Sequence, residues 1–261
     1  MSPKWINRAR GTAAAVALLV AAGACGSRAP LPPAGAVDAD KYLYERGIEA
    51  LGERHWFEAR EYFRRLVDTY PRSPFRPDAK LGIGDAYFGE GRIDSQILAA
   101  NEYREFLTFF PLHPRADYAQ YRLALSYAEQ VLAPRRDQTA TREALREVER
   151  FIQNFPNSSL MPDAEDLARS LRDRLGDYEY NIAVQYFRMR LYPGSMLRLQ
   201  YILEHYPEYS RKDQVYFYIA EMLLRANQGT EALIWYEKLL AEYPDSRHAE
   251  DAKKRIAEIK H

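Results

Sequence analysis

Residues 216–244, YFYIAEMLLRANQGTEALIWYEKLLAEYP, decide the fold of this chain. Apolar side chains recur every three or four positions in two runs, which predicts two helices joined by the short polar segment around Gly229. The marker residues are Tyr216, Ile219, Ala220 and Leu223 in the first run, and Ala232, Tyr236 and Leu239 in the second. Pro244 then ends the second helix, because proline lacks an N–H and disfavours helix in the residue before it.

The same ending recurs along the chain. Aromatic–proline pairs stand at Tyr70-Pro71, Phe110-Pro111, Phe155-Pro156, Tyr206-Pro207 and Tyr243-Pro244. Twelve positions before each proline the residue is small: Ala59, Ala99, Ala144, Ser195 and Ala232. Eight positions before it the residue is bulky: Phe63, Tyr103, Val148, Leu199 and Tyr236. A small residue lets two helices approach, and a large one four positions later fills the seam between them.

This unit resembles the tetratricopeptide repeat, a helix-turn-helix of ~34 residues. We therefore predict an all-α fold of five tetratricopeptide-like repeats in a superhelical solenoid over residues 40–261. The expected repeats are about 40–74, 75–114, 115–160, 162–210 and 211–246, followed by a C-terminal helix. The alternative is five unrelated helical hairpins that each end in proline.

Composition favours a protein-binding role over chemistry. The formal net charge is zero, which gives no indication of nucleic-acid binding, and 13% of the residues are aromatic. None of the five histidines has another at three or four positions, and no glycine-rich phosphate loop is present. We expect no enzyme activity, no catalytic residue, no metal site and no cofactor.

The N-terminus carries an export signal. Residues 1–24 have a basic start, an apolar run from Ala13 to Ala22 and the small residues before Cys25, the only cysteine. This segment resembles a bacterial lipobox, so we predict lipidation of Cys25 (with palmitate-type chains) and a flexible tether over 25–39. The alternative is an ordinary cleavage site with a chance cysteine. Because no aspartate follows Cys25, we expect a lipid anchor in the outer membrane, facing the periplasm.

Three stretches resemble one family more closely than generic repeats do. They are LRDRLGDYEY at 171–180, FPNSS at 155–159, and PRRD at 134–137. They are similar to the BamD family of outer-membrane β-barrel assembly lipoproteins, over about residues 40–260. The resemblance implies a non-enzymatic subunit that binds the periplasmic domains of BamA, other lipoproteins of the assembly machinery and unfolded outer-membrane proteins. The alternative is another envelope tetratricopeptide-repeat lipoprotein that scaffolds cell-division or peptidoglycan-synthesis proteins.

A long helix is expected between the third and fourth repeats. No proline interrupts 163–191, and Pro162 suits a first helical turn. Gly176 weakens such a helix by ~1 kcal/mol, so a break there is the alternative.

Two sets of candidate binding residues follow. The resemblance implies that Arg198 faces BamA; the alternative is a solvated surface arginine. The first helices of the first three repeats should line a groove for a hydrophobic or aromatic peptide end. The expected groove residues are Tyr44, Ile48, Leu51, Leu81, Asp85, Phe88, Tyr121, Leu125 and Ala128. The alternative is that these side chains pack against the neighbouring repeat.

Overall fold

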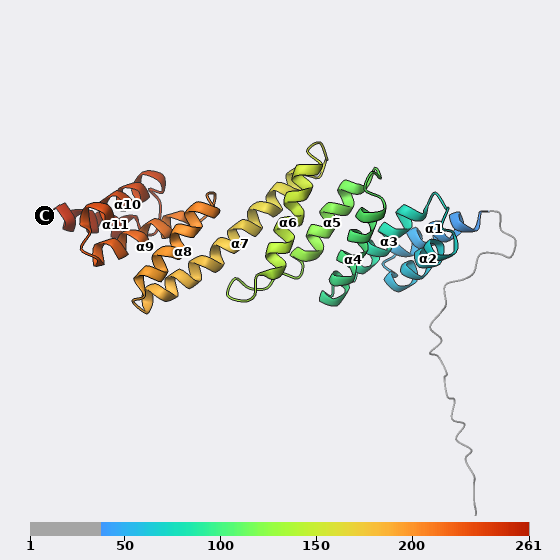
Figure 1. Cartoon of the computed structure of the whole chain (residues 1–261), viewed down its shortest axis with the longest axis horizontal. Helices are drawn as coiled ribbons and strands as arrows, with labels where there is room; N and C mark the ends of the chain where they lie inside the picture. The colour runs from blue at the N-terminus through green and yellow to red at the C-terminus, as the bar shows by residue number, and fades with distance from the viewer. Residues whose placement is uncertain (1–37, 261) are drawn as a thin grey trace, which may run out of the picture.

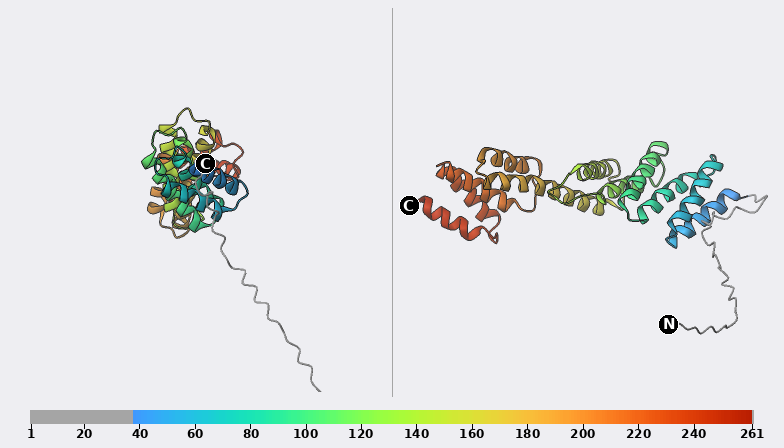
Figure 2. Two further views of the ribbon diagram at one scale, coloured as in Figure 1. Left: turned by 90° about the vertical axis from the view of Figure 1, so that its right-hand side faces the viewer. Right: turned by 90° about the horizontal axis from the view of Figure 1, so that it is seen from below.

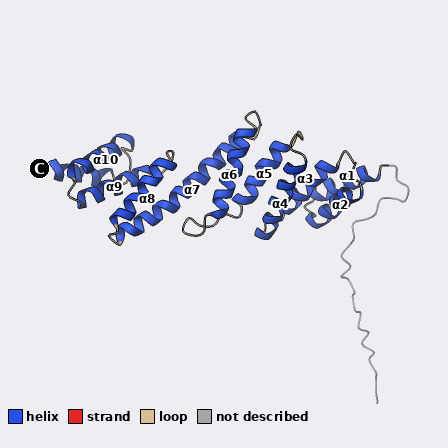
Figure 3. Ribbon diagram, in the orientation of Figure 1, coloured by secondary structure: helices blue, strands red, loops and turns tan. Residues whose placement is uncertain are grey.

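The computed structural model describes residues 38–260, and the regular structure in this range is helical throughout (Figure 3). The helices are α1 Ala39–Gly52, α2 Trp56–Thr69, α3 Arg76–Gly89, α4 Ile93–Phe109, α5 Ala116–Ala128, α6 Thr139–Asn154, α7 Met161–Arg188, α8 Tyr192–His205, α9 Lys212–Arg225, α10 Gly229–Glu242 and α11 Ala249–Lys260. Consecutive helices pack as hairpins that stack into an extended array, with α1 and α2 at one end and α10 and α11 at the other (Figures 1 and 2). The prediction of an all-α tetratricopeptide-like solenoid is confirmed.

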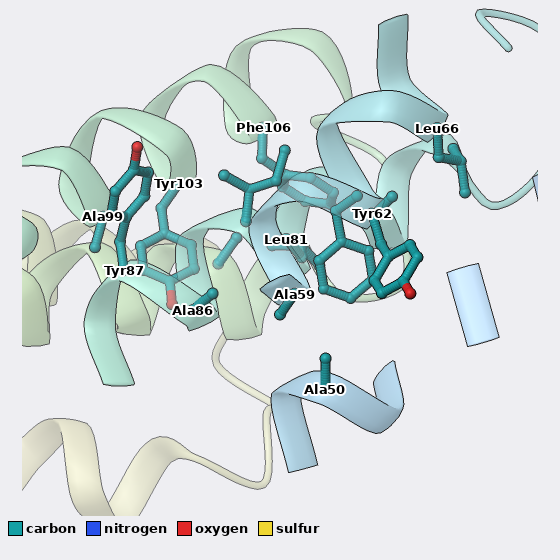
Figure 4. Close-up of a cluster of buried hydrophobic side chains, with 14 of the residues drawn as sticks. Ala50, Ala59, Tyr62, Leu66, Leu81, Ala86, Tyr87, Ala99, Tyr103 and Phe106 are labelled. Atoms are coloured by element: carbon teal, nitrogen blue, oxygen red, sulfur yellow. The ribbon is translucent and has the colours of Figure 1, made fainter. Parts of the chain in front are cut away.

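The small and bulky seam positions form the core of each hairpin. All ten of them, from Ala59 and Phe63 to Ala232 and Tyr236, have no exposed surface. Figure 4 shows the part of this core that holds Ala59, Ala99 and Tyr103. Burying each bulky side chain contributes about 1.5–3 kcal/mol, so the repeated seam supplies much of the stability.

Glycine allows the closest of these contacts. A Cβ added at Gly47 on α1 or at Gly82 on α3 would lie 2.4 Å from the ring of Phe63. The ring of this α2 residue is therefore held between two glycines from different repeats. Any side chain at either position would force the ring out of its place.

Four of the turns within the hairpins share one backbone conformation. A residue with positive φ follows the first helix at Arg54, Gly91, Arg190 and Asn227. The third hairpin instead has the longer segment 129–138, where the Gln138 amide donates to the carbonyls of Ala133 and Arg136, both at 3.0 Å.

The long helix α7 runs unbroken for 28 residues through Gly176, so the alternative of a break there is wrong. The ring of Tyr209 covers Gly176, and a Cβ at that position would lie 2.6 Å from the ring. The Tyr209 hydroxyl donates to Asp177 at 2.8 Å. Gly176 is present because Tyr209 needs the space.

The predicted signal peptide, the lipidation site Cys25 and nearly all of the predicted tether lie outside the described residues. Within 38–260, no helix has both the length and the apolar character that crossing a membrane requires.

Candidate functional site

A carboxylate lies at the centre of the first-helix face, by which we mean the surface formed by α1, α3 and α5. Asp85 on α3 accepts hydrogen bonds from the hydroxyls of Tyr103 at 2.6 Å and Tyr118 at 2.7 Å. The Nε of Arg122 on α5 lies 3.6 Å from the same carboxylate and donates to the Tyr103 hydroxyl at 3.2 Å. Burial, followed by the Asp85 charge, raises the pKa of both tyrosines, which keeps them protonated as donors.

The same arrangement recurs near the C-terminus. Glu221 on α9 accepts from the Tyr236 hydroxyl at 2.6 Å and from Arg255 Nε on α11 at 3.0 Å. Asp85 and Glu221 each directly follow the small residue of a first helix. Tyr103 and Tyr236 are both seam residues. Arg122 and Arg255 each stand eleven residues after the proline that ends the repeat. We call this set of a first-helix carboxylate, a seam tyrosine and an arginine from the following helix a tyrosine staple. It links three successive helices in both places, which indicates a structural role rather than a catalytic one.

The aromatic residues around the first staple are partly accessible. Tyr44 stacks on Phe75 with 5.1 Å between ring centroids, and the Arg122 guanidinium lies 3.7 Å from the Phe88 ring centroid. Both Tyr44 and Phe88 are half-buried, whereas Ile48 is 44% exposed. Tyr44 and Ile48 stand four residues apart on α1, and Phe88 lies near the end of α3 with the Arg122 guanidinium against its ring.

The groove expectation needs correction at Leu81. Its side chain is fully buried in the N-terminal core, because α3 packs against α1, α2 and α4 at once. Tyr121 is half-buried and packs against Phe151 at 5.7 Å, and burial raises its pKa. The partly buried Leu51 and Ala128 also pack onto hydrophobic cores. For these residues the packing alternative describes the structure better.

Arg198 has an internal partner that the sequence did not reveal. Its Nη1 donates to Glu179 on α7 at 2.8 Å, and this hydrogen bond raises the pKa of the guanidinium. The Arg198 side chain is 40% exposed, whereas the Glu179 side chain is 9% exposed. Arg198 therefore has an ion-pair partner within the chain and still exposes part of its side chain to solvent.

Exposed apolar side chains stand near Arg198 in the sequence, and we call the set Met189, Leu191, Leu197, Arg198 and Tyr201 the α8 surface. Leu197 is 68% exposed and Tyr201 39%, and their spacing of four places them on one side of α8. Met189 and Leu191 are also exposed, in the turn before α8. Exposed apolar groups beside a charge are typical of protein-binding surfaces.

No group of three or more His, Cys, Asp or Glu side chains in the range 38–260 is placed to hold a metal ion.

Comparison with known proteins agrees with the helical array. Residues 37–228 match the family model YfiO, described as an outer membrane lipoprotein, and residues 214–246 match a tetratricopeptide-repeat model. A Caulobacter vibrioides relative, named outer membrane protein assembly factor BamD, is 27% identical over 85% of this chain and 72% of its own length. A Neisseria meningitidis serogroup B relative of the same name is 26% identical, over 73% of this chain and 75% of its own length.

A solved tetratricopeptide-repeat protein of Thermus thermophilus aligns with 85% of this chain and 98% of its own, at 16% identity and a TM-score of 0.37. That likeness adds nothing to the assignment. The family match covers well over half of the chain, and this protein therefore belongs to the outer-membrane lipoprotein family that contains the BamD proteins.

Proposed function

We propose that this protein is a non-enzymatic lipoprotein subunit of the β-barrel assembly machinery, which binds unfolded outer-membrane proteins and BamA. The family match over residues 37–228 carries the proposal, since its curated relatives are named outer membrane protein assembly factors. A helical array with two partly apolar surfaces suits a protein that holds other chains.

The first-helix face is the proposed substrate site. The stacked Tyr44 and Phe75 rings and the Phe88 ring offer apolar area that a peptide could bury, at ~25 cal/mol per Å². Arg122 is fixed over Phe88 and held by Asp85, so this surface needs little ordering before it binds. An aromatic end of an unfolded outer-membrane protein would complement it.

A photoreactive residue tests this site. Placed at Tyr44 or Phe88 in the full lipoprotein, it should capture a peptide from the C-terminus of an outer-membrane barrel protein. The matched control is the same group at Phe109, which is 68% exposed on the second helix α4. Removing the peptide's terminal aromatic residue should abolish capture. Equal capture of a scrambled peptide, or equal capture at Phe109, would contradict the proposal.

The α8 surface is the proposed contact for a periplasmic domain of BamA. Leu197 and Tyr201 supply apolar area, and Arg198 supplies a charge that Glu179 only partly neutralises. Arg198→Glu would place two carboxylates together, so Arg198→Gln and Leu197→Ala are the better tests. Each should reduce the BamA that co-purifies, with helicity unchanged. Ile234→Ala, at a 61% exposed position on α10, is the control, and co-purification that matches this control would contradict the assignment.

The anchor is proposed at Cys25, which would hold the chain on the periplasmic face of the outer membrane. A Cys25→Ser variant should leave the precursor unprocessed or release the protein from membranes. A correctly processed variant that still fractionates with the outer membrane would rule out this anchor.

A further inference from the structure

A third candidate binding feature lies along the C-terminal half of α7. It is a cavity of about 450 Å³, within the range of ~300–1,000 Å³ typical of ligand sites. Its walls come from the loop at Pro134 and Arg135, the second half of α7, the start of α9 and the segment just before α11. We call it the arginine pocket, after Arg135, Arg188, Arg211 and Arg247 in its lining.

The charge in this pocket is unbalanced. Four arginines and no aspartate or glutamate line it. Arg211 forms an ion pair with Asp177, but Arg247 donates only to neutral groups, the Gln214 side chain at 2.7 Å and His248 at 3.1 Å. Arg135 and Arg188 have no ion pair within 4.0 Å among residues 38–260. At least three positive charges therefore lack a carboxylate in direct contact.

Two further carboxylates, Asp213 and Asp173, act on Arg211 through their charge, but neither forms an ion pair with an arginine of the pocket. Asp213 accepts from the Ser246 hydroxyl at 2.6 Å, and Asp173 accepts from the backbone N–H of Ser210 at 2.9 Å. Burial, together with the neighbouring charge of Arg247, lowers the pKa of Arg211 despite the opposing effect of both aspartates. Burial is the larger of the two causes, and the positive charge of Arg247 adds to it.

The walls between the arginines are flat and partly apolar. Tyr180 and Tyr218 meet edge to face with 6.0 Å between centroids, and the Arg211 guanidinium lies 5.3 Å from the Tyr180 ring centroid. Ile182 and Val184 add aliphatic surface, and the amide of Asn181 can pair with a peptide backbone, whereas the buried Gln214 side chain already accepts from Arg247.

We propose that the arginine pocket binds an acidic peptide segment of a partner protein. Its carboxylates pair with Arg188 and Arg247, since a guanidinium binds a carboxylate through two parallel hydrogen bonds. Its apolar side chains lie on Tyr180 and Tyr218. Arginines from four separate segments suit several carboxylates along a chain better than one phosphate group. This site shares no residue with the proposed substrate and BamA contacts, although its Arg188 directly precedes Met189 of the α8 surface.

Fluorescence anisotropy with the full lipoprotein in detergent micelles tests this site. The probe is a fluorescein-labelled hexapeptide of alternating glutamate and leucine. Because charge-assisted hydrogen bonds are lost, Arg188→Gln with Arg247→Gln should raise its Kd about tenfold or more. The matched control is Arg146→Gln with Arg169→Gln, which removes equal charge at arginines 54% and 60% exposed and away from the pocket. Arg135→Gln in the loop provides a second variant that leaves every helix intact.

The outcomes separate the alternatives. Supporting results are a weaker Kd in the pocket variants, an unchanged Kd in the control, and loss of binding when glutamine replaces glutamate in the probe. No binding of the probe, or equal loss in the control, overturns the proposal. Arginine-dependent binding of inorganic phosphate or phosphatidylglycerol vesicles without peptide binding also overturns it. BamA should still co-purify with the pocket variant, so this proposal and the proposed function fail independently.

Discussion

Arg122 on the first-helix face and Arg188 in the arginine pocket show two uses of one side chain in the same fold. Arg122 lies against Phe88, bonds to Tyr103 and has the Asp85 carboxylate beside it. Arg188 is exposed and lines a cavity without acidic residues. The difference is whether the chain supplies its own counter-charge. Where it does, the arginine fastens helices together; where it does not, the charge is available to another molecule.

A comparison of the five hairpins shows when the chain supplies a carboxylate for the staple. The seam residue is tyrosine in the second and fifth hairpins, and there the first helix supplies Asp85 or Glu221. In the other three it is Phe63, Val148 or Leu199, and the corresponding first-helix residues are Ile48, Leu125 and Val184. A buried hydroxyl needs a partner, so the carboxylate is present only where the seam carries tyrosine.

The largest effect is expected at the staple of the first-helix face. Asp85→Ala leaves two tyrosine hydroxyls and the partly buried Arg122 without their partner, so it should lower the free energy of unfolding by about 3 kcal/mol. Urea denaturation measures this. Asp94→Ala, whose side chain is 67% exposed, should change stability by less than about 0.5 kcal/mol. Equal effects at the two sites would show that Asp85 does not stabilise the fold.

The second staple should make stability depend on pH. Burial alone would raise the pKa of Glu221, but hydrogen bonds from Tyr236 and Arg225 outweigh it, so the folded-state pKa is lowered. Its contribution to stability is present above the unfolded value of ~4.3 and is lost as pH falls through the lower folded value. Glu221→Gln should therefore flatten the decline of the melting temperature below about pH 4.3. A parallel decline in both proteins would exclude this role.

A smaller effect is expected at Gly176 in α7, the long helix between the third and fourth repeats. Gly176→Ala improves helix propensity but drives a Cβ into the buried Tyr209 ring, with a net loss of about 1–2 kcal/mol. Gly52→Ala, in α1, meets nothing within 4 Å and should stabilise by up to ~1 kcal/mol. If both changes stabilise the protein, helix propensity rather than the Tyr209 contact governs position 176.

The smallest effect is expected in the arginine pocket. Arg188→Gln removes no ion pair within residues 38–260, so its stability should stay within ~0.5 kcal/mol of the parent. Arg122→Gln should cost about 2 kcal/mol, because Asp85 then loses the nearer of its two cations and keeps Arg115 at 4.0 Å. Thermal denaturation of both variants compares them directly. A loss at Arg188 as large as that at Arg122 would mean that this side chain also fastens helices.

Most of the fold could be predicted from local spacing, whereas the sites could not. The seam residues and the long helix follow from periodicity, because these contacts repeat at fixed distances along the chain. Leu81 was misplaced because counting from Gly84 does not show that α3 is covered on several sides. The Glu179 partner of Arg198 depends on how α7 and α8 meet across their turn. The arginine pocket draws on four segments between positions 134 and 247, and no linear pattern connects them.

The unbroken helix α7 fixes how the C-terminal hairpins are rotated about the long axis relative to the N-terminal hairpins. At 1.5 Å and 100° per residue, its 28 residues span about 42 Å and lock the direction in which the last hairpins face. One inserted residue would swing the α8 surface about 100° around the axis relative to the first-helix face. Seven inserted residues, close to two full turns, would restore the orientation and lengthen the array by about 10 Å. Relatives in which this helix differs in length should therefore differ by about whole turns if both ends engage the same assembly.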